Sequence, residues 1–221
     1  MKKNVIVTAS GKGLRMGSDI PKQFLEISGK PILMYTIEQF YNYDNSINII
    51  LTLNSDTIEF WNDLSAKHNF TIKHKIVSGG ETRFQSIKNA VSEIEANTIT
   101  AIHDGVRPLV DIDTINNCFN TAKEKGNAVP FIKINESIRE FSGTKNKQVN
   151  RDNFVLIQTP QVFKSDLLIN AYKQEFSDEF TDDASVVEQT GIEINLIEGN
   201  SENIKITKPQ DLLIAEALLR K

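Results

Sequence analysis

A loop near the amino terminus contains the residue types that bind phosphate. The apolar run Asn4–Ala9 is followed by glycines and cationic side chains at Gly11, Lys12, Gly13, Arg15, Gly17 and Lys22. Glycine lets the backbone turn sharply and bring its N–H groups close to a ligand. Fixed cations beside those groups suit a polyphosphate. The loop is therefore expected to hold a nucleotide triphosphate, and a turn with solvated cations is the alternative.

Two better-known glycine motifs do not fit this loop. The chain has no Gly-x4-Gly-Lys-Ser/Thr string of a P-loop. Its first glycines are spaced Gly-x-Gly-x3-Gly, whereas a dinucleotide-binding loop needs Gly-x-Gly-x-x-Gly. The acid that would hold a ribose after the second strand is also missing, because Leu53 is followed by Asn54 and Ser55. The loop thus indicates a nucleotide site of another type.

A second polar cluster comprises Gly79–Arg83 together with Ser86. Paired glycines beside the start of a helix expose N–H groups and let a planar or anionic ligand approach closely. A plain glycine turn with an acid in the first helical turn fits the same residues. The cluster is informative only in combination with the other polar segments.

A third cluster, His103–Pro108, follows another apolar run. Asp104 at the end of a strand is well placed for Mg²⁺ or a ribose hydroxyl, and Arg107 for a phosphate. A structural Asp–Arg pair is the alternative interpretation. His103 is expected to be a hydrogen-bonded scaffold residue, and His74 to lie at the surface.

Alternating strand and helix patterns would bring these clusters to one edge of a sheet. The expected strands are Asn4–Ala9, Ile47–Leu53, Ile72–Val77, Thr98–His103, Asn127–Phe131 and Ile192–Glu198. Such alternation predicts a Rossmann-like, mostly parallel α/β sheet flanked by helices, whose ligands bind beyond the carboxyl ends of the strands. Between about 132 and 153 short segments surround the turn Ser142–Asn146, which predicts an inserted β-hairpin arm. Residues 1–221 are expected to form a single domain with this arm.

Composition excludes several classes of protein. The net charge of −4, with acids and bases interspersed, argues against nucleic acid or an anionic membrane as the main partner. Cys118 is the only cysteine, so an internal disulfide and a cysteine-based metal site are excluded, and a packed thiol is expected. The apolar run after Lys2 and Lys3 is too short for a signal peptide, and no later run is long enough to span a membrane. A cytoplasmic protein is expected.

Taken together, the polar segments resemble sugar-phosphate nucleotidyltransferases, and more closely the 2-C-methyl-D-erythritol 4-phosphate cytidylyltransferases of non-mevalonate isoprenoid biosynthesis. The resemblance covers nearly the whole chain through eight segments in the same order: Ala9–Gly17, Pro21–Phe24, Gly29–Ile32, Gly79–Arg83, His103–Pro108, Thr159–Gln161, Thr181–Ser185 and Asn203–Thr207. One such segment alone carries little weight, whereas eight in order are specific.

The resemblance implies CTP as co-substrate, a divalent cation such as Mg²⁺ held with the help of Asp104, and a role for individual residues. The catalytic cations would be Arg15, Lys22 and Lys205. The nucleotide would be bound by Ala9, Ser10, Gly11, Gly13, Gly80, Glu81, Ser86, Asp104 and Gly105. The polyol phosphate would be bound by Arg107, Ser137, Arg151, Thr159 and Thr181. Some of the last group would reach across the interface of a homodimer formed by the arm.

Three segments depart from the usual family pattern. Thr8–Gly11 replaces Pro-Ala-Ala-Gly, Glu136 and Ser137 replace Asp-Thr before the arm, and Glu81 replaces Asp in the cytidine loop. Retained chemistry with altered substrate contacts is expected. Two other functions stay open: a cytidylyltransferase for another polyol phosphate such as ribitol 5-phosphate, and a non-catalytic nucleotide-binding protein of the same fold.

Overall fold

The computed structural model describes residues 1–11 and 20–220. Within these residues the centre is an eight-stranded sheet of order β10-β7-β11-β6-β1-β4-β5, in which β12 pairs with β7. Its strands are β1 (Lys3–Thr8), β4 (Asn48–Leu53), β5 (Lys75–Ser78), β6 (Ile99–Asp104), β7 (Asn127–Lys133), β10 (Val155–Ile157), β11 (Gln161–Lys164) and β12 (Leu196–Glu198). The half built from β6, β1, β4 and β5 is parallel, whereas β11 and β10 run antiparallel to their neighbours. The predicted α/β fold is confirmed, with a mixed, mostly parallel sheet.

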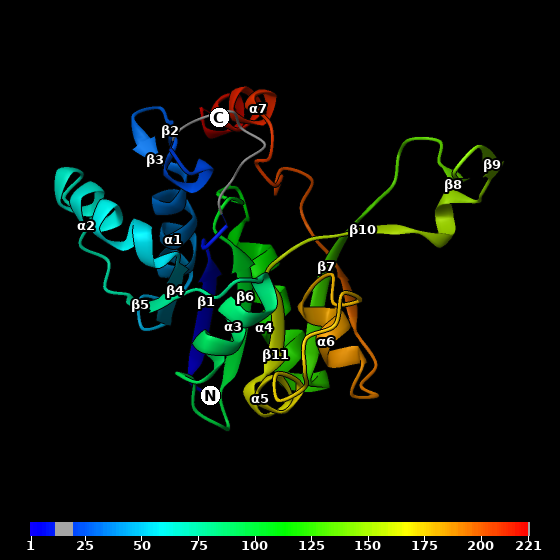
Figure 1. Cartoon of the computed structure of the whole chain (residues 1–221), viewed down its shortest axis with the longest axis horizontal. Coiled ribbons are helices and arrows are strands. Elements are labelled where there is room, and N and C mark those ends of the chain that lie inside the picture. Colours follow the sequence, from blue (N-terminus) through cyan, green and yellow to red (C-terminus); the bar gives the residue numbers. More distant parts are fainter. Residues whose placement is uncertain (12–19, 221) are drawn as a thin grey trace.

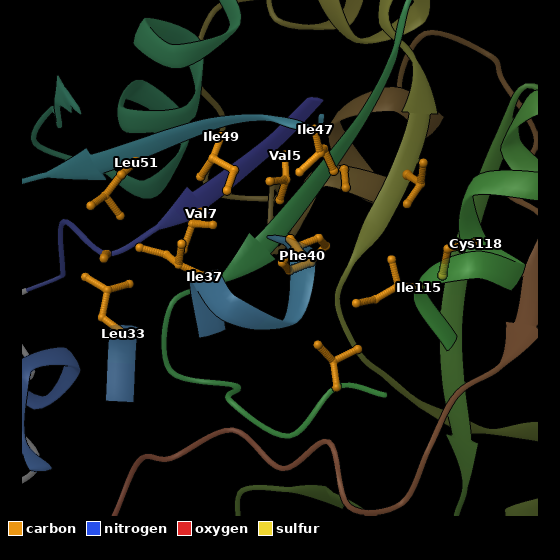
Figure 2. Close-up of a cluster of buried hydrophobic side chains, with 14 of the residues drawn as sticks. Val5, Val7, Leu33, Ile37, Phe40, Ile47, Ile49, Leu51, Ile115 and Cys118 are labelled. Carbon is orange, nitrogen blue, oxygen red and sulfur yellow. The ribbon is translucent and has the colours of Figure 1, made fainter. Parts of the chain in front are cut away.

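Helices cover both faces of the sheet (Figure 1). They are α1 (Ile32–Tyr43), α2 (Ile58–Lys67), α3 (Arg83–Val91), α4 (Ile112–Lys125), α5 (Ser165–Ala171) and α6 (Asp183–Glu188), whereas α7 (Pro209–Leu219) lies off these faces (Figure 1). Because side chains alternate along a strand, Val5 and Val7 join the core beneath α1, α2 and α4, while Ile6 joins the core beneath α3, α5 and α6. Figure 2 shows Val5 and Val7 among side chains of α1 and α4, including Cys118. Burial raises the pKa of that thiol, so Cys118 is a packed residue as predicted.

A third, smaller core holds α7 near the carboxyl ends of the parallel strands. It joins Ala215 of α7 to Ile27 of the short hairpin β2 (Glu26–Ile27) and β3 (Lys30–Pro31), and to Ile206 and Val106. The main-chain N–H of Ile206 donates to the carbonyl of Val106 over 2.9 Å. The segment that carries Lys205 is thereby fixed next to the loop that follows β6.

The predicted hairpin arm projects from the body of the molecule (Figure 1). Its strands β8 (Arg139–Ser142) and β9 (Lys145–Gln148) pair in antiparallel fashion and are exposed along their whole length. Short 3-10 helices occur at η2 (Lys22–Phe24), η3 (Ser55–Thr57) and η4 (Arg151–Asn153). None of the described helices is long and apolar enough to cross a membrane.

The prediction that His74 lies at the surface is wrong. Its ring is half-buried, and Nε2 accepts a hydrogen bond of 2.9 Å from the indole N–H of the fully buried Trp61. Nδ1 lies 2.8 Å from the carbonyl oxygen of Ile72, so this nitrogen carries the hydrogen. Burial lowers the pKa of His74. The residue is part of the packing around α2 because only a neutral ring can accept the bond from Trp61.

Candidate active site

A cavity of about 640 Å³ opens at the carboxyl ends of the parallel strands. Its lining comes from segments far apart in the sequence: Thr8–Gly11, Lys22, Gln23, Asn54, Gly79–Arg83, Ser86, Asp104, Val106 and Lys205. A second cavity, of about 310 Å³, has walls from Arg83, Asp104, Arg107, Ile157–Thr159, Gln161, Thr181, Asp182 and Lys205. Arg83, Asp104 and Lys205 line both cavities. The two cavities therefore meet at one carboxylate and two cations.

Gln23 fixes the start of the glycine loop. Its side chain is 2% exposed, and Nε2 donates to the carbonyl oxygens of Ala9 (2.7 Å) and Gly11 (3.3 Å). Lys22 beside it lines the larger cavity and reaches the carbonyl of Ile206 over 3.3 Å. The structure thus brings the start of the loop and Lys22 together. Gly13 and Arg15 lie outside the described residues.

The Gly79–Ser86 segment is held against this loop by hydroxyl groups. Ser10 Oγ donates to Ser86 Oγ over 2.9 Å, and the N–H of Gly80 donates to the same oxygen over 3.0 Å. A methyl group on Gly79 would lie 2.5 Å from Ser10 Cβ, so a side chain there would push the two segments apart. Glu81 lines the cavity from the same turn. The predicted nucleotide-binding residues of the two segments therefore line the same cavity.

Asp104 is a buried carboxylate surrounded by cations. Its Oδ2 lies 3.0 Å from Lys205 Nζ and 3.2 Å from Arg107 Nε. Burial would raise the pKa of Asp104, but the charges of Lys205, Arg83 and Arg107 outweigh burial and hold the pKa well below its usual range. The carboxylate is consequently ionised at neutral pH. Gly105 follows it directly, and a Cβ at Gly105 would lie 3.0 Å from that of Ala9.

His103 is a scaffold residue, as the sequence predicts. Its fully buried ring places Nε2 3.0 Å from the carbonyl oxygen of Arg107 and Nδ1 3.0 Å from Thr159 Oγ1. Since a carbonyl can only accept, Nε2 carries the hydrogen and Nδ1 accepts from the Thr159 hydroxyl. The N–H of Asp104 donates to the same hydroxyl oxygen over 3.1 Å. Burial lowers the pKa of His103 to about 4, so the ring is neutral at pH 7.

The predicted polyol-phosphate residues fall into two groups. Arg107, Thr159 and Thr181 line the smaller cavity, although Arg107 also pairs with Asp104 and donates to the carbonyl of Asn203 over 2.7 Å. Ser137 and Arg151 line a separate hollow on the arm, where Arg151 donates to the carbonyl of Asn135. A single chain does not bring this second group to the two cavities.

Comparison with known proteins then assigns the family. The family model described as IspD, 2-C-methyl-D-erythritol 4-phosphate cytidylyltransferase, matches residues 4–221. The chain belongs to this family. Among the cytidylyltransferases it resembles, that of Bacteroides thetaiotaomicron is 48% identical over 219 residues, which cover 99% of this chain and 100% of the relative. That of Bacteroides fragilis is 49% identical with the same coverage.

Solved structures of cytidylyltransferases have the same fold. The Thermus thermophilus structure superposes with a TM-score of 0.80 at 28% identity and covers 100% of both chains. The Francisella tularensis structure gives a TM-score of 0.80 at 31% identity, covering 98% of this chain and 99% of that one. The similarity therefore extends over the whole length of these proteins.

Two side chains of this cytidylyltransferase at the junction were not among the predicted site residues. Arg83 binds Asp183 through two hydrogen bonds, of 2.9 Å from Nη1 and 2.5 Å from Nη2. Asp183 is fully buried and also accepts a bond of 2.7 Å from the Tyr172 hydroxyl. Burial would lower the pKa of Arg83, but the adjacent carboxylate raises it, so the guanidinium stays charged. Both residues lie within segments that carry the family resemblance, Gly79–Arg83 and Thr181–Ser185, and this is the signal that could have found them.

Asp104 is the candidate ligand for a divalent cation. The part of the chain that the structure describes has no group of three or more His, Cys, Asp or Glu side chains that could hold a metal alone. Mg²⁺ usually binds one or two carboxylates together with substrate phosphates. The ionised Asp104 at the meeting point of the cavities fits that pattern.

Proposed function

We propose that the chain transfers CMP from CTP to 2-C-methyl-D-erythritol 4-phosphate, giving 4-diphosphocytidyl-2-C-methyl-D-erythritol and pyrophosphate for isoprenoid biosynthesis. Family membership over the full length supports this activity. The observation that carries it is the pair of adjoining cavities, one lined by the glycine segments and the other by hydroxyl and guanidinium groups, which share Arg83, Asp104 and Lys205. Two anionic substrates could thereby meet at one charged junction.

The reaction requires no side chain to remove a proton. A phosphate monoester is already ionised near pH 7, and its oxygen attacks the α-phosphorus of CTP as pyrophosphate leaves. The buried histidine beside Asp104 and the single cysteine agree with this chemistry. His103 is neutral with both ring nitrogens hydrogen-bonded, and the Cys118 thiol is buried with a raised pKa. Neither residue is available as a base or nucleophile.

Catalysis then rests on placing the two anions together and stabilising the charge that develops on the α-phosphate and the leaving group. Lys205 at the junction would donate to the α-phosphate, and Lys22 in the larger cavity to the triphosphate. The N–H groups of the Ala9–Gly11 segment would bind further phosphate oxygens. Arg15 keeps the role that the family resemblance implies.

Asp104 would hold Mg²⁺ together with phosphate oxygens of the nucleotide. The cation would neutralise charge on the triphosphate as the leaving group forms. Such a cation would also account for an ionised carboxylate in a site built for anions. With Lys205 and Arg107 on its Oδ2, the carboxylate does not act as an uncompensated negative charge.

Thr159 would accept a hydrogen bond from a hydroxyl of the polyol but could not donate one. Its own hydrogen is donated to His103 Nδ1, and one lone pair accepts from the N–H of Asp104. The remaining lone pair accepts a hydrogen bond from the substrate. Thr181, exposed at the same cavity, is free of this restriction and would supply the second hydroxyl contact.

A homodimer would complete the smaller cavity with Ser137 and Arg151 of a partner chain. Exposed apolar side chains on the arm and on the neighbouring sheet edge support this assembly: Phe141 at 73%, Leu156 at 51%, Phe154 at 49% and Leu196 at 48% exposure. Large apolar side chains grouped on an exposed edge are typical of an interface. Sedimentation analysis of the native chain and of Phe141→Asp tests the assembly.

The function is tested by incubating the chain with CTP and Mg²⁺ plus one polyol phosphate at a time, and measuring pyrophosphate. Release with 2-C-methyl-D-erythritol 4-phosphate, and little with ribitol 5-phosphate or without acceptor, is expected. A preference for ribitol 5-phosphate would contradict the assigned substrate. CTP binding without pyrophosphate release would instead indicate a non-catalytic nucleotide-binding protein.

A further inference from the structure

The Arg83–Asp183 pair lies at the junction of the two cavities but has no role in the transfer as described above. Arg83 is the first residue of α3 and Asp183 the first residue of α6, and 100 positions separate them in the sequence. Arg83 lines both cavities, whereas Asp183 is fully buried. The pair therefore connects the core beneath α3 and α6 to the place where the two substrates would meet.

The guanidinium of Arg83 has hydrogen-bond donors to spare. It carries five N–H groups, and the two bonds to Asp183 use one on each Nη. No described residue accepts from the other three, and the side chain is 34% exposed. A planar group with several donors, held in place and partly open to a cavity, matches the geometry of phosphate oxygens.

Asp183 is in turn held so that it can orient Arg83. The Tyr172 hydroxyl donates to Asp183 Oδ1 over 2.7 Å, the same oxygen that accepts from Arg83 Nη1. The preceding residue, Asp182, caps α6 through the N–H of Ser185 and accepts from Gln161 over 2.8 Å. The carboxylate thus sits on a fixed helix end, and its two oxygens set the plane of the guanidinium.

We propose that Arg83 is a further catalytic residue, which donates to a phosphoryl oxygen at the junction, and that Asp183 is the positioning residue that aims it. The inference rests on the proposed CMP transfer. Because Asp183 offsets the charge of Arg83, the arginine acts through directed hydrogen bonds at short range and adds little to long-range attraction of CTP. Its effect is therefore expected in turnover more than in nucleotide binding.

The test compares Arg83→Gln, Asp183→Asn and the double variant R83Q/D183N in steady-state pyrophosphate release. Loss of one fixed donor to developing charge costs about 10²-fold in kcat, and each single variant is expected to lose about that much with little change in either KM. The double variant is expected to be no worse than the singles, because Asp183 acts through Arg83. The proposal would be overturned if the loss of kcat in the double variant equalled the product of the two single losses, or if the double variant kept a near-native kcat.

The double variant and a control variant separate a loss of folding from a loss of catalysis. Arg83→Gln alone leaves an unpaired buried carboxylate, whereas R83Q/D183N removes both charges and leaves two amides that can pair. Its melting temperature is expected to be close to that of the native chain. Asp44→Asn removes an ion pair of 2.9 Å to Lys3 outside both cavities and should leave kcat unchanged. If the native chain is inactive, the proposed function itself is wrong. If the native chain and the double variant are both active, only the role proposed for Arg83 is wrong.

Discussion

Replacing Lys205 by methionine removes the ammonium group at the junction and keeps most of the aliphatic side chain. Lys205 is 40% exposed, and its Nζ lies 3.0 Å from Asp104 Oδ2. The Asp104 side chain is only 9% exposed, so loss of this charged partner is expected to cost about 2 kcal/mol of stability. Arg107 remains 3.2 Å from the same oxygen and keeps the carboxylate paired. The variant is therefore expected to fold, with a melting temperature about 4–8 °C below the native value.

The cost to catalysis should be larger than the cost to stability. A preorganised donor at a site of developing charge is worth about 10²–10³ in kcat, or about 2.7–4 kcal/mol. Turnover of Lys205→Met, measured by pyrophosphate release, is expected to fall by that factor, while the Kd for CTP measured by calorimetry changes less than about tenfold. Lys2→Met, which loses an exposed pair with Glu95, is the matched control. A kcat within a few-fold of native, or a loss confined to Kd, would refute the role of Lys205.

Three further changes test neighbouring parts of the site. Lys22→Ala is expected to lower kcat by about 10²-fold and leave the melting temperature nearly unchanged. Native turnover of this variant in the same assay would contradict the role of Lys22. Unfolding by urea should show a free energy about 3 kcal/mol lower at pH 4 than at pH 6.5. The pKa of His103 is about 4 in the folded chain, so between these pH values the unfolded chain binds a proton that the folded chain does not. If the free energy of unfolding of His103→Gln fell by the same amount between these pH values, a group other than His103 would be the cause. Gly105→Ala puts a Cβ 3.0 Å from Leu33 Cδ1 and should cost about 1–3 kcal/mol in a thermal melt, whereas an unchanged melting temperature would contradict this packing.

Much of the fold could be predicted because the parallel strands are buried on both faces. Apart from Thr100, strand β6 is apolar up to His103. Its residues are buried throughout, so its sequence is a nearly continuous apolar run that ends in Asp104. The position of the site follows from the same rule, since polar segments after such strands share one edge. Periodicity did not reveal that β11 runs antiparallel, because a short strand has the same pattern in either direction.

The contacts that hold the site together could not be predicted in this way. Gln23 binds main-chain carbonyls of the loop, and Asp183 binds Arg83 across 100 residues of sequence. Neither contact has a local pattern, because each depends on how separate segments pack. The prediction for His74 is wrong for the same reason, since its partner Trp61 lies on another element. Ser137 and Arg151 line a hollow on the arm, and no pattern in the sequence shows whether a second chain brings them to the two cavities.

A structure of the chain with bound 4-diphosphocytidyl-2-C-methyl-D-erythritol is the most direct measurement of the central claim, that the two substrates meet at the shared junction. The diphosphate bridge is expected within hydrogen-bonding distance of Lys205 and Arg83. The cytosine should lie against Gly79–Glu81 in the larger cavity, and the polyol against Thr181 in the smaller one. A diphosphate bound away from Lys205, or a polyol outside the smaller cavity, would contradict that claim.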